Sequence, residues 1–277
     1  ALFLFVRRDR RMPGRKPDSL MTIVLRLRVA APTALKHLAA SAAAAIGCAF
    51  LVFGLWYPFP YGELAGGRGL FLLIVGVDVV CGPLLTLIVF DRRKPRAELL
   101  RDIGIVVLIQ LAALVYGVAA AAQARPVFLA FEGNRFRVVC APDIETENLA
   151  RAPEALRRPG LGGPRLIGAR LARPDDADFP ESIKLSLGGV PPAFRPERWV
   201  DYDVQRQDVV RAIQPLSTLR RKHPSRQADI DAAVRQAGLA EDRLGFLPLV
   251  SKRRDDWVAF VDRESAVPVA YLPLDGW

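Results

Sequence analysis

The sequence has few of the residues from which catalytic and metal sites are usually built. Its 277 residues include 2 His and 3 Cys, and no pair of them has the spacing of metal ligands. Cys140 is the single thiol after residue 122, which excludes a disulfide within that part of the chain. No Ser stands in a Gly-x-Ser-x-Gly turn, and Gly160, Gly162 and Gly163 lack the Lys-Ser/Thr that completes a phosphate loop. We therefore expect no metal, no cofactor, no catalytic residue and no enzymatic activity.

Positive charge is abundant, but it does not lie where a nucleic acid would need it. The formal net charge is +10. Residues 1–37 carry nine Lys/Arg against two Asp, and residues 91–102 carry five Lys/Arg against three acidic residues. Residues 123–277 carry 24 Lys/Arg against 22 Asp/Glu, a near-neutral balance that offers a polyanion little attraction. We therefore expect no nucleic-acid partner, and the basic segments are typical of membrane flanks.

Three apolar stretches lie at about residues 38–56, 69–90 and 103–122. Each has roughly the 20 residues that a helix needs to cross the hydrocarbon core of a bilayer. An aromatic cluster from Trp56 to Tyr61 precedes the second stretch, and such rings favour the membrane–water interface. A cleaved signal peptide is the weaker interpretation of the first stretch, because the apolar run is long and two more follow. The sequence predicts a membrane protein with three transmembrane α-helices within residues 38–122.

The flanking charges also predict the orientation. The basic segment 1–37 and the basic loop 91–102 are expected to be cytoplasmic by the positive-inside rule. An odd number of spans then places residues 123–277 on the other side, in the periplasm of a Gram-negative cell. We expect a multi-pass protein of the bacterial inner membrane, surrounded by membrane lipid, with a cytoplasmic N-terminus. Residues 1–20 do not begin with Met, and Met21 is the expected natural start.

Residues 123–277 predict a C-terminal α+β domain. Pro126–Glu132 and Arg135–Ala141 alternate as strands do, and Gly133-Asn134 between them is typical of a hairpin turn. A helix is expected over Asp143–Ala155 and a strand over Arg165–Leu171. The remaining expected elements are helices within Asp175–Gly188 and Tyr202–Ala237, interrupted by Pro215 and Pro224, and a three-stranded meander, Phe246–Lys252, Asp256–Asp262 and Val267–Leu272.

One carboxylate, Asp78, interrupts the second apolar stretch. An ionised carboxylate at mid-membrane costs about 2.5–3.5 kcal/mol, so such a residue usually faces a partner or a cavity. Gln110 of the third stretch lies within about one helical turn of the same depth, so an Asp78–Gln110 hydrogen bond is feasible. One interpretation is a proton or ion step. The other, which the absence of further buried charges favours, is a protonated carboxyl that locks two spans together or meets a partner helix.

Small residues recur along the third stretch at Ala113, Gly117 and Ala121. A spacing of four residues places them on one helix face, where another helix backbone can approach closely. We expect this face to pack against a helix.

Short motifs follow one another along both halves of the chain. They are Trp56-Tyr57-Pro58, Gly66-Gly67, Gly76-Val77-Asp78, Gly82-Pro83-Leu84-Leu85-Thr86-Leu87, Gln110 to Leu114, Tyr116-Gly117, Ala124 to Val127, Phe131-Glu132, Asp143-Ile144, Leu247-Pro248-Leu249 and Leu272 to Asp275. In this order, over residues 35–277, they resemble the TfpX/TfpZ family of type IV pilin accessory proteins.

The resemblance implies an inner-membrane protein that supports type IV pilin stability and pilus assembly, and with it twitching motility. A type IV pilin subunit is the implied partner, together with the pilus assembly machinery, and no catalytic residues are implied. The action would then rest on contacts alone. The alternative is a membrane-anchored periplasmic enzyme that modifies pilins or envelope components. Such an enzyme requires a convergent acid, base or nucleophile, and the sequence does not offer one.

Overall fold

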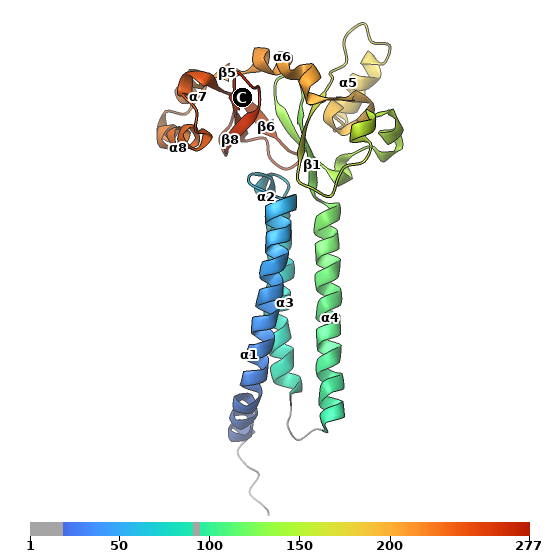
Figure 1. Ribbon diagram of the computed structural model, residues 1–277, viewed down its shortest axis with the longest axis vertical. Helices are drawn as coiled ribbons and strands as arrows, with labels where there is room; N and C mark the ends of the chain where they lie inside the picture. The colour runs from blue at the N-terminus through green and yellow to red at the C-terminus, as the bar shows by residue number, and fades with distance from the viewer. Residues whose placement is uncertain (1–18, 91–94) are drawn as a thin grey trace, which may run out of the picture. The chain divides into compact units, whose positions relative to one another are not determined.

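The computed structural model describes residues 19–90 and 95–277 (Figure 1). Within these ranges the side chains at positions 19–27, 29, 68, 70, 73, 74, 77 and 78 are outside the description. The chain forms two compact units. The first runs to Ala43 and includes Val77–Ala112, and the second consists of Ala44–Gly76 and Ala113–Trp277. The predicted boundary between residues 122 and 123 therefore falls inside the second unit.

All three predicted apolar stretches are helical. Helix α1 spans Ser19–Leu51 and continues into a π-helical turn, η1, at Val52–Trp56, while α3 spans Gly67–Val89 and α4 spans Arg96–Gln123. Among the described residues, two segments are long and apolar enough to cross a membrane, Ala30–Trp56 and Arg96–Gln123. The apolar stretch that is described in α3 is shorter, Val79–Val89. These findings support a membrane anchor of at least two candidate spans.

The α+β pattern predicted for the C-terminal region is confirmed by one mixed sheet of eight strands. The strands follow the order β4-β3-β1-β2-β6-β7-β8, and β5 pairs with β6. Strand pairs β1–β3 and β2–β6 are parallel, and the other pairs are antiparallel. The strands are β1 Pro126–Phe131, β2 Phe136–Cys140, β3 Arg165–Ala169, β4 Trp199–Val200, β5 Gln214–Pro215, β6 Leu244–Val250, β7 Trp257–Asp262 and β8 Pro268–Leu272.

The predicted hairpin, third strand and C-terminal meander all form within one or two residues of their expected bounds. In the hairpin, Leu129 lies opposite Val138, and in the meander Leu247 lies opposite Ala259. Every residue of β1, β6 and β7 is buried, so these strands are covered on both faces. Near-continuous apolar runs are typical of strands in that position.

The helix predicted over residues 143–155 does not form as an α-helix. The chain there makes three 3-10 segments, η2 Ala141–Asp143, η3 Thr146–Arg151 and η4 Glu154–Leu156. Pro153 has no N–H to donate and drives Ala152 to an extended conformation, with ψ of 156°. Helical hydrogen bonding therefore ends before an α-helix can establish itself.

Each face of the sheet has its own cover (Figure 1). On one face, α6 (Tyr202–Ala212) packs against alternate residues of β1, β2, β6 and β7. The Asp201 carboxylate caps this helix by accepting from the Asp203 N–H at 3.0 Å. On the other face, α7 (Leu216–Lys222) and α8 (Gln227–Ala237) cover β6 to β8, and the 3-10 segments cover β1 to β4 around Trp199. The sheet domain has one more α-helix, α5 (Phe179–Leu187), which precedes α6 in the chain.

Candidate functional site

Gln110, one member of the predicted intramembrane polar pair, lies against α3. A Cβ atom added to Gly82 would fall 2.2 Å from Gln110 Nε2, so the glycine leaves room for the Gln110 side chain in this position against α3. Position 78 lies one helical turn before Gly82, and the Asp78 side chain is outside the described part of the chain. The Asp78–Gln110 hydrogen bond therefore stays a prediction.

A second polar contact, between α1 and α3, was missed by the sequence analysis. His37 Nδ1 lies 2.6 Å from Thr86 Oγ1, and Thr86 is buried. Our domain prediction had placed His37 at the end of the basic N-terminal segment, but α1 continues through it. Thr86 follows Gly82 by four residues, so both share one face of α3. The four-residue spacing of Gly82 and Thr86 was the sequence signal that could have indicated a polar face on α3.

The predicted helix-packing face on α4 is divided between inside and outside. Ala113 is exposed, whereas Gly117 is buried and Ala121 is 3% exposed. Ala121 belongs to a cluster with Trp56 and Tyr57, and the Tyr57 hydroxyl donates to the Ala121 carbonyl at 3.0 Å. Of the three positions, Ala113 is the one that another helix could still reach.

The segment between η1 and α3 enters the core of the sheet domain. It contains the short helix α2, Tyr61–Leu64, and both of these end residues belong to the same buried cluster as β1, β6 and β7. Leu64 is fully buried, and the Ser251 hydroxyl donates to its carbonyl at 2.8 Å. The Phe59 ring lies 6.0 Å from the Trp257 ring. A segment that the sequence presents as a loop between two spans is therefore part of the sheet domain.

Three of the four rings in the aromatic cluster before α3 are buried in protein, whereas Phe59 is 56% exposed. The expected place of the cluster at the membrane interface stays a prediction. Trp56, Tyr57 and Tyr61 are 8%, 2% and 7% exposed. The Trp56 indole N–H donates to the Leu161 carbonyl at 2.9 Å, so its polar edge is satisfied by protein. A Cβ on Gly67 would fall 2.4 Å from the Tyr57 ring. The glycine-rich bend thus permits α3 to begin directly against this ring.

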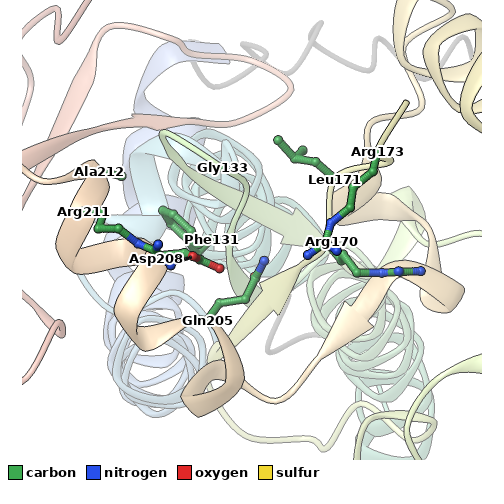
Figure 2. Close-up of a pocket in the computed structure, with 9 residues that line it drawn as sticks. All are labelled: Phe131, Gly133, Arg170, Leu171, Arg173, Gln205, Asp208, Arg211 and Ala212. Atoms are coloured by element: carbon green, nitrogen blue, oxygen red, sulfur yellow. Dashed lines mark hydrogen bonds and ion pairs between the residues drawn. The ribbon is translucent and has the colours of Figure 1, made fainter. Parts of the chain in front are cut away.

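An open groove of about 400 Å³ lies between the end of β3 and α6. Figure 2 shows Gln205, Asp208 and Arg211 on the α6 side, Arg170 and Arg173 on the β3 side, and Phe131 between them. The groove is lined by Phe131, Gly133, Arg170, Leu171, Arg173, Gln205, Asp208, Arg211 and Ala212. Arg211 forms an ion pair with Asp208. The lining therefore carries three arginines and one carboxylate, while the Phe131 side chain is fully buried.

A second hollow of about 700 Å³ adjoins the first and shares Gly133 and Leu171 with it. Its other wall is α5, and exposed apolar side chains stand around it: Leu171, Ile183 and Leu187 are 47%, 45% and 86% exposed. The buried Glu132 carboxylate accepts from Arg137 Nε at 2.7 Å. We call these two hollows, on either side of the β1–β2 turn, the hairpin grooves. Their exposed apolar and cationic groups suit the binding of another macromolecule.

Cys140, at the end of β2, is poorly suited to nucleophilic chemistry. Burial, assisted by the Asp143 carboxylate, raises the pKa of Cys140 to about 12. The thiolate is the reactive form, and its fraction at neutral pH is then very small. In the described ranges, no group of three or more His, Cys, Asp and Glu residues is arranged to hold a metal ion.

Comparison with known proteins gives one matching family model and several similar individual proteins. A family model described as Fimbrial assembly protein FimB matches residues 25–66. Two fimbrial assembly proteins of Dichelobacter nodosus, of serogroups E1 and I, are each 33% identical over 235 residues, which is 84% of this chain and 91% of the relative. A third, of serogroups C1 and C2, is 40% identical over 116 residues, 42% of this chain and 88% of that protein. No solved structure matches.

The stretch that the family model matches corresponds to the first helix and the segment that follows it. It runs from Leu25 in α1 through η1 and α2 to Gly66, and so it ends with the segment that packs into the sheet domain. The two longer matches extend this similarity over most of the sequence. On this evidence the chain belongs to the fimbrial assembly protein family.

Proposed function

We propose that this protein acts in the assembly of type IV fimbriae, as an accessory of the TfpX/TfpZ kind that contacts pilin subunits. One observation carries the proposal: two fimbrial assembly proteins share 33% identity with this chain over 84% of its length. The names of these relatives give the process, fimbrial assembly. The surfaces of this chain suggest how contacts could serve it.

We further propose that α1, α3 and α4 all span the inner membrane, with the N-terminus in the cytoplasm and the sheet domain in the periplasm. Helix α3 has 23 residues, a length of roughly 35 Å at 1.5 Å per residue, which is sufficient to cross. The basic segments at residues 1–37 and 91–102 support this orientation. Alkaline-phosphatase fusions after Gln123 should be active and fusions after Arg96 inactive. The opposite pattern would exclude a periplasmic role.

We propose that the protein works by contact and not by catalysis. Before assembly, a pilin has an apolar helix in the inner membrane and a globular part in the periplasm, and this chain offers a surface to each. Ala113 on α4 is open to a partner helix, and the hairpin grooves present Leu171, Ile183 and Leu187 beside arginines. Exposed apolar side chains with a charged rim are typical of protein interaction sites.

The test is recovery of pilin with the full-length protein after mild detergent extraction. We expect Leu187→Asp and Leu171→Asp to reduce pilin recovery strongly, because each places a charge in the apolar part of the hairpin grooves. Val204→Asp is the matched control, since Val204 on α6 is 71% exposed and lies outside both grooves. Equal recovery of pilin with all three variants would exclude the grooves as the contact surface.

Genetics separates contact from catalysis. Deleting the gene should lower surface piliation and twitching, and the rescue should rise in proportion to the amount of protein supplied. Full rescue by trace amounts would instead favour the pilin-modifying enzyme. Normal piliation without this protein would contradict a role in fimbrial assembly.

A further inference from the structure

We propose that residues 157–165 form a contact with the membrane surface in which Leu161 enters the lipid interface and neighbouring arginines bind anionic phospholipid headgroups. We call this segment the interface loop. The inference rests on the proposed membrane-crossing helices and goes beyond the role in fimbrial assembly. It concerns a part of the sheet domain that is far in sequence from every span.

Hydrogen bonds connect the interface loop to the C-terminal ends of η1 and α4. The Trp56 indole at the end of η1 donates to the Leu161 carbonyl at 2.9 Å. Arg125 Nη2 donates to the Gly160 carbonyl at 2.7 Å, while Arg125 Nη1 donates to the Ala122 carbonyl of α4, also at 2.7 Å. The two candidate membrane spans end at Trp56 and at Gln123, which follows Ala122 directly. Where they leave the hydrocarbon core, the loop is therefore held at the same level.

The loop also touches the helix end through its backbone. A Cβ on Gly163 would fall 2.9 Å from the Leu55 carbonyl, so a glycine is required for this contact. Leu161 nevertheless does not pack into the cluster around Trp56: its side chain is 73% exposed. A large apolar side chain directed outward beside the end of a membrane span is suited to lipid.

Charge distinguishes this stretch from the rest of its domain. Residues 151–165 carry four arginines (151, 157, 158 and 165) and one acid, Glu154, a net charge of +3. Residues 123–277 as a whole carry 24 basic against 22 acidic residues. All four arginines are exposed, and none forms an ion pair with a carboxylate in the described part of the chain.

Two of these arginines also stabilise the shape of the loop. Arg157 Nε donates to the Ala152 carbonyl at 2.9 Å, and Arg165 Nη1 donates to the Ala155 carbonyl at 3.0 Å. Each guanidinium has further N–H groups for an outside acceptor. Arginine binds phosphate oxygens in a bidentate manner, and basic residues near a bilayer attract anionic lipid. Apolar insertion with phosphate binding points to anionic phospholipid as the partner.

Depth measurement on the full-length protein in lipid nanodiscs tests the insertion. The environment-sensitive dye NBD would be attached at Leu161→Cys after replacement of Cys48, Cys81 and Cys140 by Ala. We expect a blue-shifted emission that is quenched by brominated lipid. Leu187→Cys on α5, where the side chain is 86% exposed, is the matched control and should show neither effect. Water-like, unquenched emission at position 161 would overturn the proposal.

A third label separates this failure from failure of the membrane assignment. Leu108 on α4 is 67% exposed, and a dye at Leu108→Cys should be quenched strongly. Quenching at 108 without quenching at 161 would overturn the interface loop and leave the spans intact. No quenching at either position would overturn both. Quenching at 161 that disappears when pilin is added would assign the loop to protein binding instead.

Headgroup selectivity is measured without the label. Lipid that remains bound after detergent extraction from mixed phosphatidylglycerol–phosphatidylcholine membranes should be enriched in phosphatidylglycerol. Arg157→Gln with Arg158→Gln should reduce this enrichment by roughly fivefold per arginine. Arg221→Gln with Arg235→Gln removes the same charge from exposed positions on α7 and α8 and should leave the enrichment unchanged. Equal loss in both double variants would show that net charge, and not this loop, selects the lipid.

Discussion

Leucine and valine side chains behave oppositely in α4 and in the central strands of the sheet. In α4, Leu108 and Val115 are each 67% exposed. In β6 and β7, Leu247 and Val258 are fully buried. The residue types are the same, so the difference does not come from local propensity. The two regions are adapted to different surroundings.

Water is a poor surrounding for the helical region. Monomeric soluble proteins rarely expose a large contiguous apolar surface, yet α4 alone exposes Leu100, Leu108, Ile109, Leu111, Val115 and Tyr116 by more than half. Lipid accepts such a surface at little cost. The sheet, in contrast, buries its apolar side chains against its own helices, as a domain in water must.

The same polar substitution should separate the two regions. Leu247→Asn removes a fully buried side chain from β6 and leaves an amide without a suitable partner. We expect the free energy of unfolding of the sheet domain to fall by about 4–6 kcal/mol. Denaturant titration in detergent micelles, followed by the fluorescence of the buried Trp199 and Trp257, measures this loss.

Leu108→Asn in α4 is the matched substitution. Because Leu108 faces outward, the unfolding of the sheet domain should be almost unchanged. Equal losses for the two variants would abolish the contrast between the regions and would imply that this face of α4 is buried against protein.

Leu64 sharpens the comparison, because it precedes the sheet in sequence by about sixty residues yet is fully buried in its core. Leu64→Ala should lower the free energy of unfolding of the sheet domain by about 3 kcal/mol. Leu55→Ala truncates a side chain that is 44% exposed and should cost less than about 1 kcal/mol. If the two variants are equally stable in the same titration, the α2 segment does not belong to the core.

The sequence is informative where structure depends on neighbours along the chain. The hairpin at Gly133-Asn134 and the meander that ends at Leu272 were predicted because apolar runs and turn residues are local signals. The apolar helices were recognised by length and composition in the same way. The helix predicted over 143–155 was wrong because the local effect of Pro153 outweighed composition.

Contacts between distant residues were not predictable in this way. Tyr61 and Leu64 are spaced by three, which is compatible with one buried face of a helical turn, but the segment is too short for periodicity to be decisive. The bond from Trp56 to Leu161 joins residues 105 positions apart, and no pattern in either stretch indicates the other. For Asp78 the sequence predicted a polar contact, and Gln110 lies against Gly82, one turn further along α3.

The smallest of the expected effects comes from a buried carboxylate of the sheet domain. Asp262 at the end of β7 is 5% exposed. It accepts from the Ser265 hydroxyl at 2.7 Å, from the backbone N–H groups of Ser265 and Glu264, and from Arg243. Burial alone would raise the pKa of this carboxyl, but these hydrogen bonds outweigh it and lower the pKa to about 2. The ionised form is thus favoured in the folded domain.

The sheet domain should therefore lose stability in acid through Asp262. Because the pKa is lower in the folded state than in the unfolded state, the stabilisation is complete above about pH 4 and is lost as the pH falls towards 2. Its size is about 1–2 kcal/mol, after allowance for Arg243, whose side chain is 45% exposed.

Asp262→Asn should be less stable than the unsubstituted protein at pH 7, and the difference should vanish near pH 2. Asp255→Asn, at an exposed position in the β6–β7 turn, should follow the unsubstituted protein throughout. A constant difference between the Asp262→Asn and unsubstituted proteins across this range would show that the carboxylate contributes through its shape and not through its charge.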